Sequence, residues 1–294
     1  MMRFICILML SGCCVYSHAD TDAYIKLFDH HGKHPRVVSV TFPGNANTLD
    51  MYNSIYGHGA VIENPWVAFR IYMDNRQSLD LYVKQKPQME LDVTGFYTTP
   101  EQLAGGYGCD VLWAGKSIAA GSFRGWQDNA PVTIDTVSAR TQTVLSSSCV
   151  EVVDREWVYN GHKINMLQKY SVKEDSRDLW VEITLEGHED TDLFCTGIQK
   201  LEIDNTGFIR QHGVAASWGK NVPDKSYPDM VEQVGLSIFI DTEYIVDVVE
   251  DELNYIFVVR PDRNGKIRYK VRAAGDREKD GFKSAQQWFD AIEK

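Results

Sequence analysis

Short stretches in which apolar and polar residues alternate recur along most of the chain. They are rich in β-branched and aromatic residues, which is typical of half-buried strands. The clearest are residues 37–42, 66–73, 79–83, 132–137, 141–153, 156–159, 163–172, 179–185, 236–240, 254–259 and 266–273. So many short strands indicate an all-β protein with mainly antiparallel sheets.

Turn signals lie between these stretches. Asn160-Gly161 is a strong hairpin signal, and the polar runs "KEDSRD" and "PDRNGK" also join strand pairs. Only residues 284–293 have a helical pattern, with Ser284 as the N-cap. We expect one large antiparallel β-sandwich with a C-terminal helix. Residues 98–130 and 209–229 lack a clear pattern and are expected to form loops over one rim or face.

The first residues have the layout of a signal peptide. Arg3 precedes an apolar run over residues 4–16, which is too short to span a membrane. Cleavage after Ala19 and lipidation at Cys13, within the lipobox-like "LSGC", both remain open. We expect a signal peptide over residues 1–19, one β domain over 20–294, and a periplasmic or extracellular protein, with an outer-membrane lipoprotein as the alternative.

The formal charge of −11 in 294 residues disfavours binding to nucleic acid, which requires a concentrated basic face. A short anionic ligand held by a few local arginines remains compatible with it. The cysteines do not form a disulfide scaffold, and one bridge plus a free thiol remains open. The histidine-rich run at residues 29–34 is a weak metal candidate, because adjacent histidines rarely converge in a strand. No cofactor is predicted.

The segment "YGHGAVIENPWVAFRIY", residues 56–72, is the first candidate site. His58 lies between two glycines, which allow a sharp turn or a close approach of ligand. Arg70 and Tyr72 differ by two positions and face the same side of a strand. The alternative is that Glu63 and Arg70 form a structural ion pair and Tyr72 is half-buried.

The segment "GGYGCDVLWAGKSIAAGSFRGW", residues 105–126, is the second candidate. Tyr107 and Asp110 lie at the entrance of a strand-like run, and Arg124 and Trp126 follow it. A glycine-rich turn in which Asp110 caps backbone amides explains the same residues.

The segment "IRQHGVAASWGKNVPDKSY", residues 209–227, contributes Arg210, His212 and Trp218. A tryptophan beside glycine is suited to stacking on the apolar face of a sugar ring, although tryptophan also fills protein cores.

Taken together, "GHG…ENPWVAFRIYMD…LDLYVK", "FYTTPEQLAGGYGCDVLWAGKSIAAGSF", "AASWGKN" and "RYKVRAAG…FKSAQQWFDAI" resemble a known family. It consists of secreted proteins of unassigned domain function from bacterial polysaccharide-utilisation loci. The resemblance implies the galactose-mutarotase-like supersandwich fold, and one branch is similar to an ulvan oligosaccharide dehydratase. The chain departs from the family at Tyr97-Thr98, where a Tyr-His pair is usual, and at Tyr107, where tryptophan is usual. A role for that histidine cannot be transferred.

The resemblance implies β-elimination on oligosaccharides that contain uronic acid. Such a reaction needs a base, an acid for the leaving oxygen, and stabilisation of the developing enediolate. The candidates are Arg70, then Arg210, as carboxylate clamp; His58 or His212 as base; and Tyr72, Tyr97 or Tyr107 as acid. Glu63, Asp110, Arg124, Trp126 and Trp218 are predicted to bind substrate.

Two other functions remain open at this point. A non-catalytic glycan-binding protein would use Trp66, Trp126 and Trp218 as stacking surfaces. A glycoside hydrolase would use two carboxylates, for which Glu63 and Asp110 are the candidates. In each case the ligand is an acidic oligosaccharide.

Overall fold

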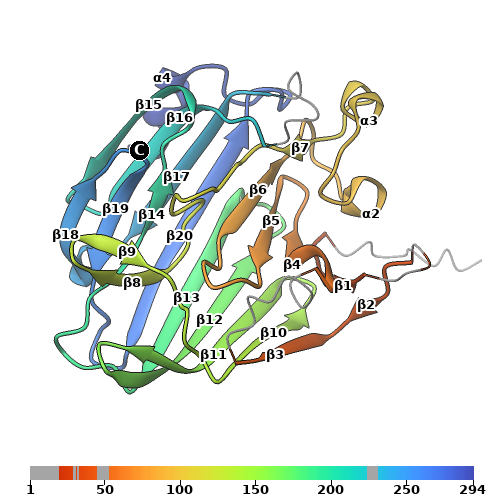
Figure 1. Ribbon diagram of the computed structural model, residues 1–294. Coiled ribbons are helices and arrows are strands. Elements are labelled where there is room, and N and C mark those ends of the chain that lie inside the picture. Colours follow the sequence, from red (N-terminus) through yellow and green to blue (C-terminus); the bar gives the residue numbers. More distant parts are fainter. Residues whose placement is uncertain (1–19, 29–30, 32, 45–52, 224–230) are drawn as a thin grey trace, which may run out of the picture.

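The computed structural model describes residues 20–28, 31, 33–44, 53–223 and 231–294, and most of its regular structure is β-strand (Figure 1). The expected signal segment 1–19, with Cys13, lies outside the described residues. Within them, no helix has both the length and the apolar character needed to cross a membrane.

The strands form three sheets in which every pairing is antiparallel. The nine-stranded sheet has the order β15 (Ile203–Arg210), β16 (Val214–Lys220), β17 (Val234–Ile240), β20 (Lys266–Gly275), β13 (Asp178–Glu186), β12 (His162–Val172), β11 (Cys149–Tyr159), β10 (Ala139–Ser146), β3 (Ser39–Pro43). The six-stranded sheet has the order β2 (Arg36–Val37), β1 (Asp22–Leu27), β4 (Ile55–Glu63), β5 (Val67–Tyr72), β6 (Leu79–Val83), β7 (Cys109–Asp110). The five-stranded sheet has the order β18 (Ile245–Glu250), β19 (Asn254–Val259), β14 (Phe194–Gln199), β8 (Arg124–Gln127), β9 (Ala130–Val132), and the 3-10 helix η1 (Thr242–Tyr244) precedes β18.

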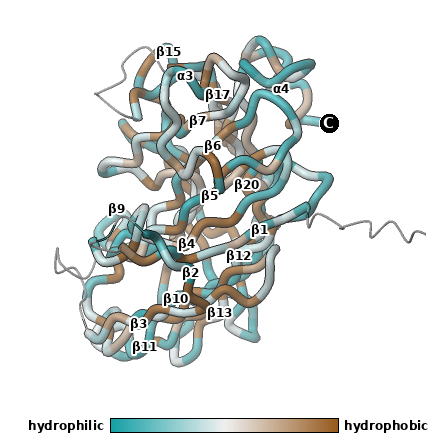
Figure 2. The backbone as a smooth tube through the Cα atoms, turned by 90° about the vertical axis from the view of Figure 1, so that its right-hand side faces the viewer, coloured by the Kyte–Doolittle hydropathy of each residue, from teal (hydrophilic) through white to brown (hydrophobic). Residues whose placement is uncertain are grey.

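The two smaller sheets pack against one face of the nine-stranded sheet (Figure 1). Alternate residues of all three sheets, such as Ile71 of β5, Ile183 of β13 and Phe257 of β19, belong to one continuous hydrophobic core. Figure 2 shows hydrophobic segments along these strands and hydrophilic segments mainly at the turns. The predicted all-β antiparallel sandwich is confirmed.

The predicted hairpin at Asn160-Gly161 joins β11 to β12, and Gly161 has a positive φ of 84°. The C-terminal helix is also confirmed as α4 (Ala285–Ile292), with the Ser284 hydroxyl accepting a hydrogen bond from the Gln287 amide. Its Trp288 packs against Gly235 of β17, where an added Cβ would lie 2.4 Å from the indole.

Three expectations about local structure are wrong. The expected strand 132–137 ends at Val132, because Ile134 instead turns its backbone toward Asn75 and Arg140. The run 141–153 belongs to two strands, since β10 ends at Ser146 and β11 begins at Cys149. Strand β11 then continues through the run 156–159, across a bulge at Glu156, which has a φ of 51°. The expected loop at 209–229 contains strand β16, and its residues 224–230 lie outside the described chain.

Two short helices, α2 (Leu91–Thr94) and α3 (Pro100–Ala104), were not predicted. They lie in the segment 84–108, which connects β6 to β7 (Figure 1). Thr99 and Gln102 form a capping box at the start of α3. The segment is anchored at Glu63, whose carboxylate pairs with Lys84 at 2.6 Å and accepts the amide of Glu90 at 2.7 Å.

A closed polar network lies between the nine-stranded and six-stranded sheets. Asp154 accepts hydrogen bonds from Arg140 and from Gln77, each at 2.5 Å, and all three side chains are buried. Gln77 also contacts Gln168, whose amide oxygen accepts from Tyr170. Because Gln77 belongs to the β5–β6 turn, this network fixes the turn that carries Arg76 and Ser78.

Candidate active site

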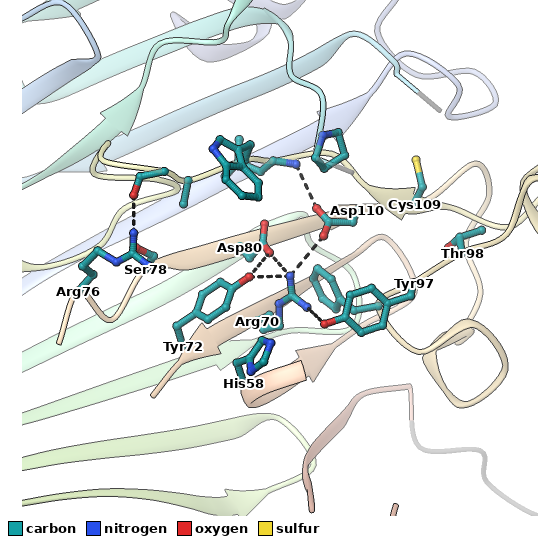
Figure 3. Close-up of a pocket in the computed structure, with 16 residues that line it drawn as sticks. His58, Arg70, Tyr72, Arg76, Ser78, Asp80, Tyr97, Thr98, Cys109 and Asp110 are labelled. Atoms are coloured by element: carbon teal, nitrogen blue, oxygen red, sulfur yellow. Dashed lines mark hydrogen bonds and ion pairs between the residues drawn. The ribbon is translucent and has the colours of Figure 1, made fainter. Parts of the chain in front are cut away.

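A cavity of about 460 Å³ lies on the outer face of the six-stranded sheet, the face that points away from the core (Figure 3). Strands β4 to β7 supply its floor, and the segments around residues 96–98 and 112–115 supply its walls. It is lined by His58, Arg70, Tyr72, Arg76, Ser78, Asp80, Phe96, Tyr97, Thr98, Cys109, Asp110, Leu112, Trp113, Ala114, Gly115 and Pro223.

Strand alternation brings Arg70 into this cavity. Phe69 and Ile71 point into the core, so Arg70 and Tyr72 point outward, as the sequence predicts. Segment 84–108 covers this face, and the ring centre of its Phe96 lies 4.3 Å from the guanidinium carbon of Arg70. The result is an arginine that is only 3% exposed although it lies on the outer face of a sheet.

The guanidinium of Arg70 holds four polar side chains together (Figure 3). Its Nη1 donates to the Tyr97 hydroxyl at 3.0 Å, and its Nη2 donates to the Tyr72 hydroxyl at 2.7 Å. Nη2 also pairs with Asp80, and with Asp110 at 3.3 Å. Burial alone lowers the pKa of Arg70, but Asp80, followed by Tyr72, Asp110 and Tyr97, outweighs it and the pKa is raised well above its usual value.

The Tyr72 hydroxyl lies between a cation and an anion. It accepts from Arg70 and donates to Asp80 Oδ2 at 3.1 Å. Asp80 is the direct cross-strand neighbour of Arg70 in the β5–β6 hairpin, and its other oxygen accepts the Leu81 amide at 2.9 Å. This arrangement provides a short path for a proton from the phenol to a fixed carboxylate.

His58 reaches the cavity through a bulge in β4. Gly57 and His58 have φ angles of 74° and 66°, and the register with β1 shifts at this point. At Gly59 an added Cβ would lie 1.9 Å from the carbonyl oxygen of Ile71, so only glycine fits. The imidazole lies parallel to the Tyr72 ring, with centroids 6.4 Å apart. A bulge beside a cavity is a common way to direct a functional side chain.

Arg76 and Trp113 line the more open part of the cavity and were missed in the sequence. The Arg76 side chain is 43% exposed, although it donates to Asp74 at 3.0 Å and to the Gly115 carbonyl at 2.6 Å. Trp113 is 59% exposed. Arg76 lies in the turn between β5 and β6, so a predicted hairpin at this place was the available signal. Exposure of a tryptophan cannot be read from its neighbours in the chain.

Of the predicted residues, His58, Arg70, Tyr72, Tyr97 and Asp110 line the cavity together. Glu63 does not, because it anchors the segment 84–108 through Lys84. The suggested Glu63–Arg70 ion pair is therefore wrong: each residue pairs with another partner. Tyr107 is outside the lining, and its carbonyl accepts from Gln85 at 2.8 Å.

The other predicted residues lie elsewhere. Arg124 is buried behind the cavity and donates to Ser78 at 3.2 Å, and its burial lowers its pKa. Trp126 and Trp218 are buried in separate hydrophobic clusters, so their rings are covered by protein. Trp66 is half-buried, with the Arg177 guanidinium carbon 4.1 Å from its ring centre.

Arg210 and His212 lie at the β15–β16 turn, away from this cavity. Arg210 pairs with Glu293, and His212 borders a second cavity on the nine-stranded sheet. Neither residue lines the cavity that contains Arg70.

Candidate metal ligands and cysteines can be placed in the described part of the chain. It contains no group of three or more histidine, cysteine or carboxylate side chains arranged to hold a metal ion. Part of the histidine-rich run 29–34 lies outside that part. Cys109, Cys149 and Cys195 are free, so no bridge joins any two of them.

Fold and site together define an antiparallel β-sandwich protein whose cavity groups two tyrosines, two aspartates, two arginines and a histidine. A family profile described as a domain of unknown function (DUF4861) matches residues 17–294. The chain belongs to this family. The resemblance to proteins of unassigned domain function is confirmed at that level.

Comparison with curated proteins gave no match. Among solved structures, a protein provisionally assigned as an aldose 1-epimerase from Klebsiella pneumoniae subsp. pneumoniae MGH 78578 is similar, with 8% identity and a TM-score of 0.40. The similarity covers 87% of this chain and 91% of that one. A 4-alpha-glucanotransferase from Thermococcus litoralis has 13% identity and a TM-score of 0.36, with 74% of this chain covered. The match spans only 38% of the glucanotransferase.

Proposed function

We propose that this protein is a carbohydrate-active enzyme that acts on uronic-acid-containing oligosaccharides by β-elimination. The observation that carries the proposal is the pair of tyrosine hydroxyls, from Tyr72 and Tyr97, which Arg70 binds on the wall of one cavity. Positioned phenols beside a cation suit a reaction that removes one proton and supplies another. The predicted export would place the enzyme where polysaccharide fragments are found.

In this reaction the proton on the carbon next to the carboxylate is removed, a carbon–carbon double bond forms, and the bond from the β carbon to oxygen breaks. Tyr72 or His58 takes the first proton, since the phenol is backed by Asp80 and the imidazole lies beside it. Tyr97 protonates the leaving oxygen, because its side chain is 47% exposed and its hydroxyl lies in the cavity.

The geometry changes the role of Arg70. The sequence favours Arg70 as the clamp for the substrate carboxylate, but two aspartates already pair with its guanidinium. We therefore assign it as a positioning residue for the two phenols. Arg76 binds the substrate carboxylate, because its guanidinium is the more exposed of the two in the lining. Trp113 provides an exposed apolar face for a sugar ring.

Hydrolysis is a second candidate, favoured by one observation. Asp80 and Asp110 both contact the same nitrogen, Nη2 of Arg70, so two carboxylates lie close together on the cavity wall. A pair of this kind serves as acid and nucleophile or base in glycosidases. It replaces the pair Glu63 and Asp110 suggested from the sequence.

The test is incubation with unsulfated and sulfated uronate oligosaccharides while ultraviolet absorbance and new reducing ends are followed together. Elimination gives a conjugated double bond that absorbs near the far-ultraviolet edge, and Tyr97→Phe abolishes this signal. New reducing ends without absorbance indicate hydrolysis. Saturable binding without either product contradicts both candidates and indicates a glycan-binding protein.

A further inference from the structure

A second feature lies on the opposite outer face of the sandwich. In β20, Val271 and its alternate neighbours point into the core, so Lys266, Arg268, Lys270 and Arg272 all point outward. This run, "KIRYKVR", has no part in the cavity around Arg70. Because the cavity is on the outer face of the six-stranded sheet, the two regions are separated by both sheets and the core between them.

Two carboxylates on β13 form ion pairs with these four cations. Lys266 and Arg268 both pair with Glu182, at 3.1 and 2.7 Å. Lys270 and Arg272 both pair with Asp178, at 3.3 and 2.5 Å. Each of these two carboxylates is thus shared by two cations, and the charge of Asp262 also acts on Arg268. The two carboxylates on β13 are separated by four residues, on the order of 13 Å along a strand.

The carboxylates are ionised in this arrangement. The hydrogen bond from Arg268 is the largest effect on Glu182 and lowers its pKa. Burial raises the pKa of Asp178, but the hydrogen bond and charge of Arg272 outweigh it, so that pKa is also lowered. The row thus gathers four cations on one strand, in a protein whose formal net charge is −11.

Aromatic side chains flank the middle of this strand. In the register of the sheet, Lys270 lies opposite Trp180 of β13 on one side and Phe239 of β17 on the other. The Lys270 ammonium is 4.7 Å from the Phe239 ring centre, and Lys173 is 4.5 Å from that of Trp180. A trough of about 370 Å³ includes two of the four cations, Arg268 and Lys270, and is also lined by Trp180, His212, Phe239 and Asp241.

We infer that this trough is a second, non-catalytic binding site for an acidic glycan, with its aromatic rings against sugar faces and with Arg268 and Lys270 against carboxylate or sulfate groups. Aromatic faces alone suit a neutral sugar, and cations alone suit any polyanion; their alternation across three strands suits a ligand that has both features. Asp241 is the one acidic side chain in the lining, and it favours a chain with spaced charges over a densely charged one.

The inference rests on the proposed function only for the choice of acidic glycan, since the residues are different. Its physical consequence is that a long substrate is held at the protein surface while its end reacts in the cavity. Affinity for a polymer then exceeds affinity for a short fragment, because two sites on one protein engage one chain.

The probes are polygalacturonate, its fully methyl-esterified form, dextran sulfate and dextran, with binding followed by affinity electrophoresis. We expect retardation by the charged polymers and not by their neutral counterparts. Lys270→Gln and Trp180→Ala are each expected to weaken binding about tenfold. Lys163→Gln is the matched control, because Lys163 is an exposed cation on β12 of the same sheet, paired with a single carboxylate, and outside the trough.

Equal binding by wild type, Lys270→Gln and Trp180→Ala would overturn the inference, as would equal binding of charged and neutral polymers. Lys270→Gln keeps the test valid if Trp180→Ala is poorly folded, which a melting curve shows. The outcome is also independent of turnover. Loss of binding in Lys270→Gln without any elimination product would support the trough and contradict the proposed reaction. Elimination together with unchanged binding in Lys270→Gln would support the proposed reaction and contradict the trough as a binding site.

Discussion

Arg70 and Arg140 are both buried arginines paired with aspartate, and they lie on opposite sides of the six-stranded sheet. Arg140 is 1% exposed, and it contacts Asp154 and the Ile134 carbonyl within the closed inter-sheet network. Arg70 is 3% exposed, but one of its partners, the Tyr97 side chain, is 47% exposed at the cavity. Burial and residue type are therefore nearly the same in the two places.

The difference lies in where each chain of hydrogen bonds ends. Around Arg140 the bonds run from Asp154 to Gln77, Gln168 and Tyr170, all within the core. Around Arg70 they end at two phenols and two carboxylates that line a cavity. The first arrangement fixes two sheets relative to each other, and the second is available to a ligand. Access rather than composition separates a structural cluster from a candidate site.

The largest expected effect is on stability and comes from the closed cluster. Arg140→Ala leaves the Asp154 carboxylate buried without its cation, which should cost about 3–5 kcal/mol of unfolding free energy. Urea denaturation measures this loss. Arg155→Ala is the control, since Arg155 is exposed in the same strand pair and should change stability by less than about 0.5 kcal/mol. A small effect in Arg140→Ala would mean that the network is hydrated and not closed.

A substitution in the cluster around Arg70 should lower turnover far more than it lowers stability. Tyr72→Phe removes one hydroxyl that Arg70 and Asp80 hold, so turnover should fall by about 10²-fold or more while stability changes by about 1 kcal/mol. The ultraviolet assay and a urea titration measure the two quantities on one preparation. Tyr107→Phe is the control, because Tyr107 is an equal candidate in the sequence but lies outside the cavity lining. Equal losses in both variants would contradict the assignment.

The sequence predicts the layers better than it predicts the contacts. Alternation along β5 correctly places Arg70 and Tyr72 on one face, because side-chain direction in a strand is a local property. Asp80 was missed although the β5–β6 hairpin register puts it opposite Arg70. The sequence favours Trp126 and Trp218 over the exposed Trp113, although both are buried, because burial depends on neighbours that are distant in sequence. Helices α2 and α3 are too short to show a period.

Glu232, behind the cavity wall, is intermediate between the clusters of Arg140 and Arg70. It is buried, and its nearest cation, Arg277, is 3.5 Å away. Burial raises the pKa of Glu232 to about 7, and the charge of Arg277 only partly offsets it. The folded protein then binds a proton that the unfolded chain releases. This contribution to stability is therefore present below the unfolded pKa near 4.5 and is lost as pH rises to about 7.

Glu232→Gln removes this dependence, because the amide stays neutral. Relative to wild type, the variant should gain on the order of 1–3 kcal/mol between pH 4.5 and pH 8. Unfolding free energies measured at several pH values give this difference. Glu186→Gln, at an exposed position on β13, should show no such trend. A flat difference for Glu232→Gln would mean that Arg277 compensates the carboxylate fully.

The smallest effect concerns the backbone that presents His58. A histidine at a φ of 66° is strained, and glycine at this position relieves the strain, so His58→Gly should raise stability by about 0.5–1 kcal/mol. The same change removes the imidazole beside Tyr72 and should lower turnover. Asp204→Gly is the matched control: Asp204 is exposed with a φ of 53° outside the cavity, so its replacement should raise stability and leave turnover unchanged. If both variants gain stability and keep full turnover, the strained bulge does not serve catalysis, and the base is Tyr72 rather than His58.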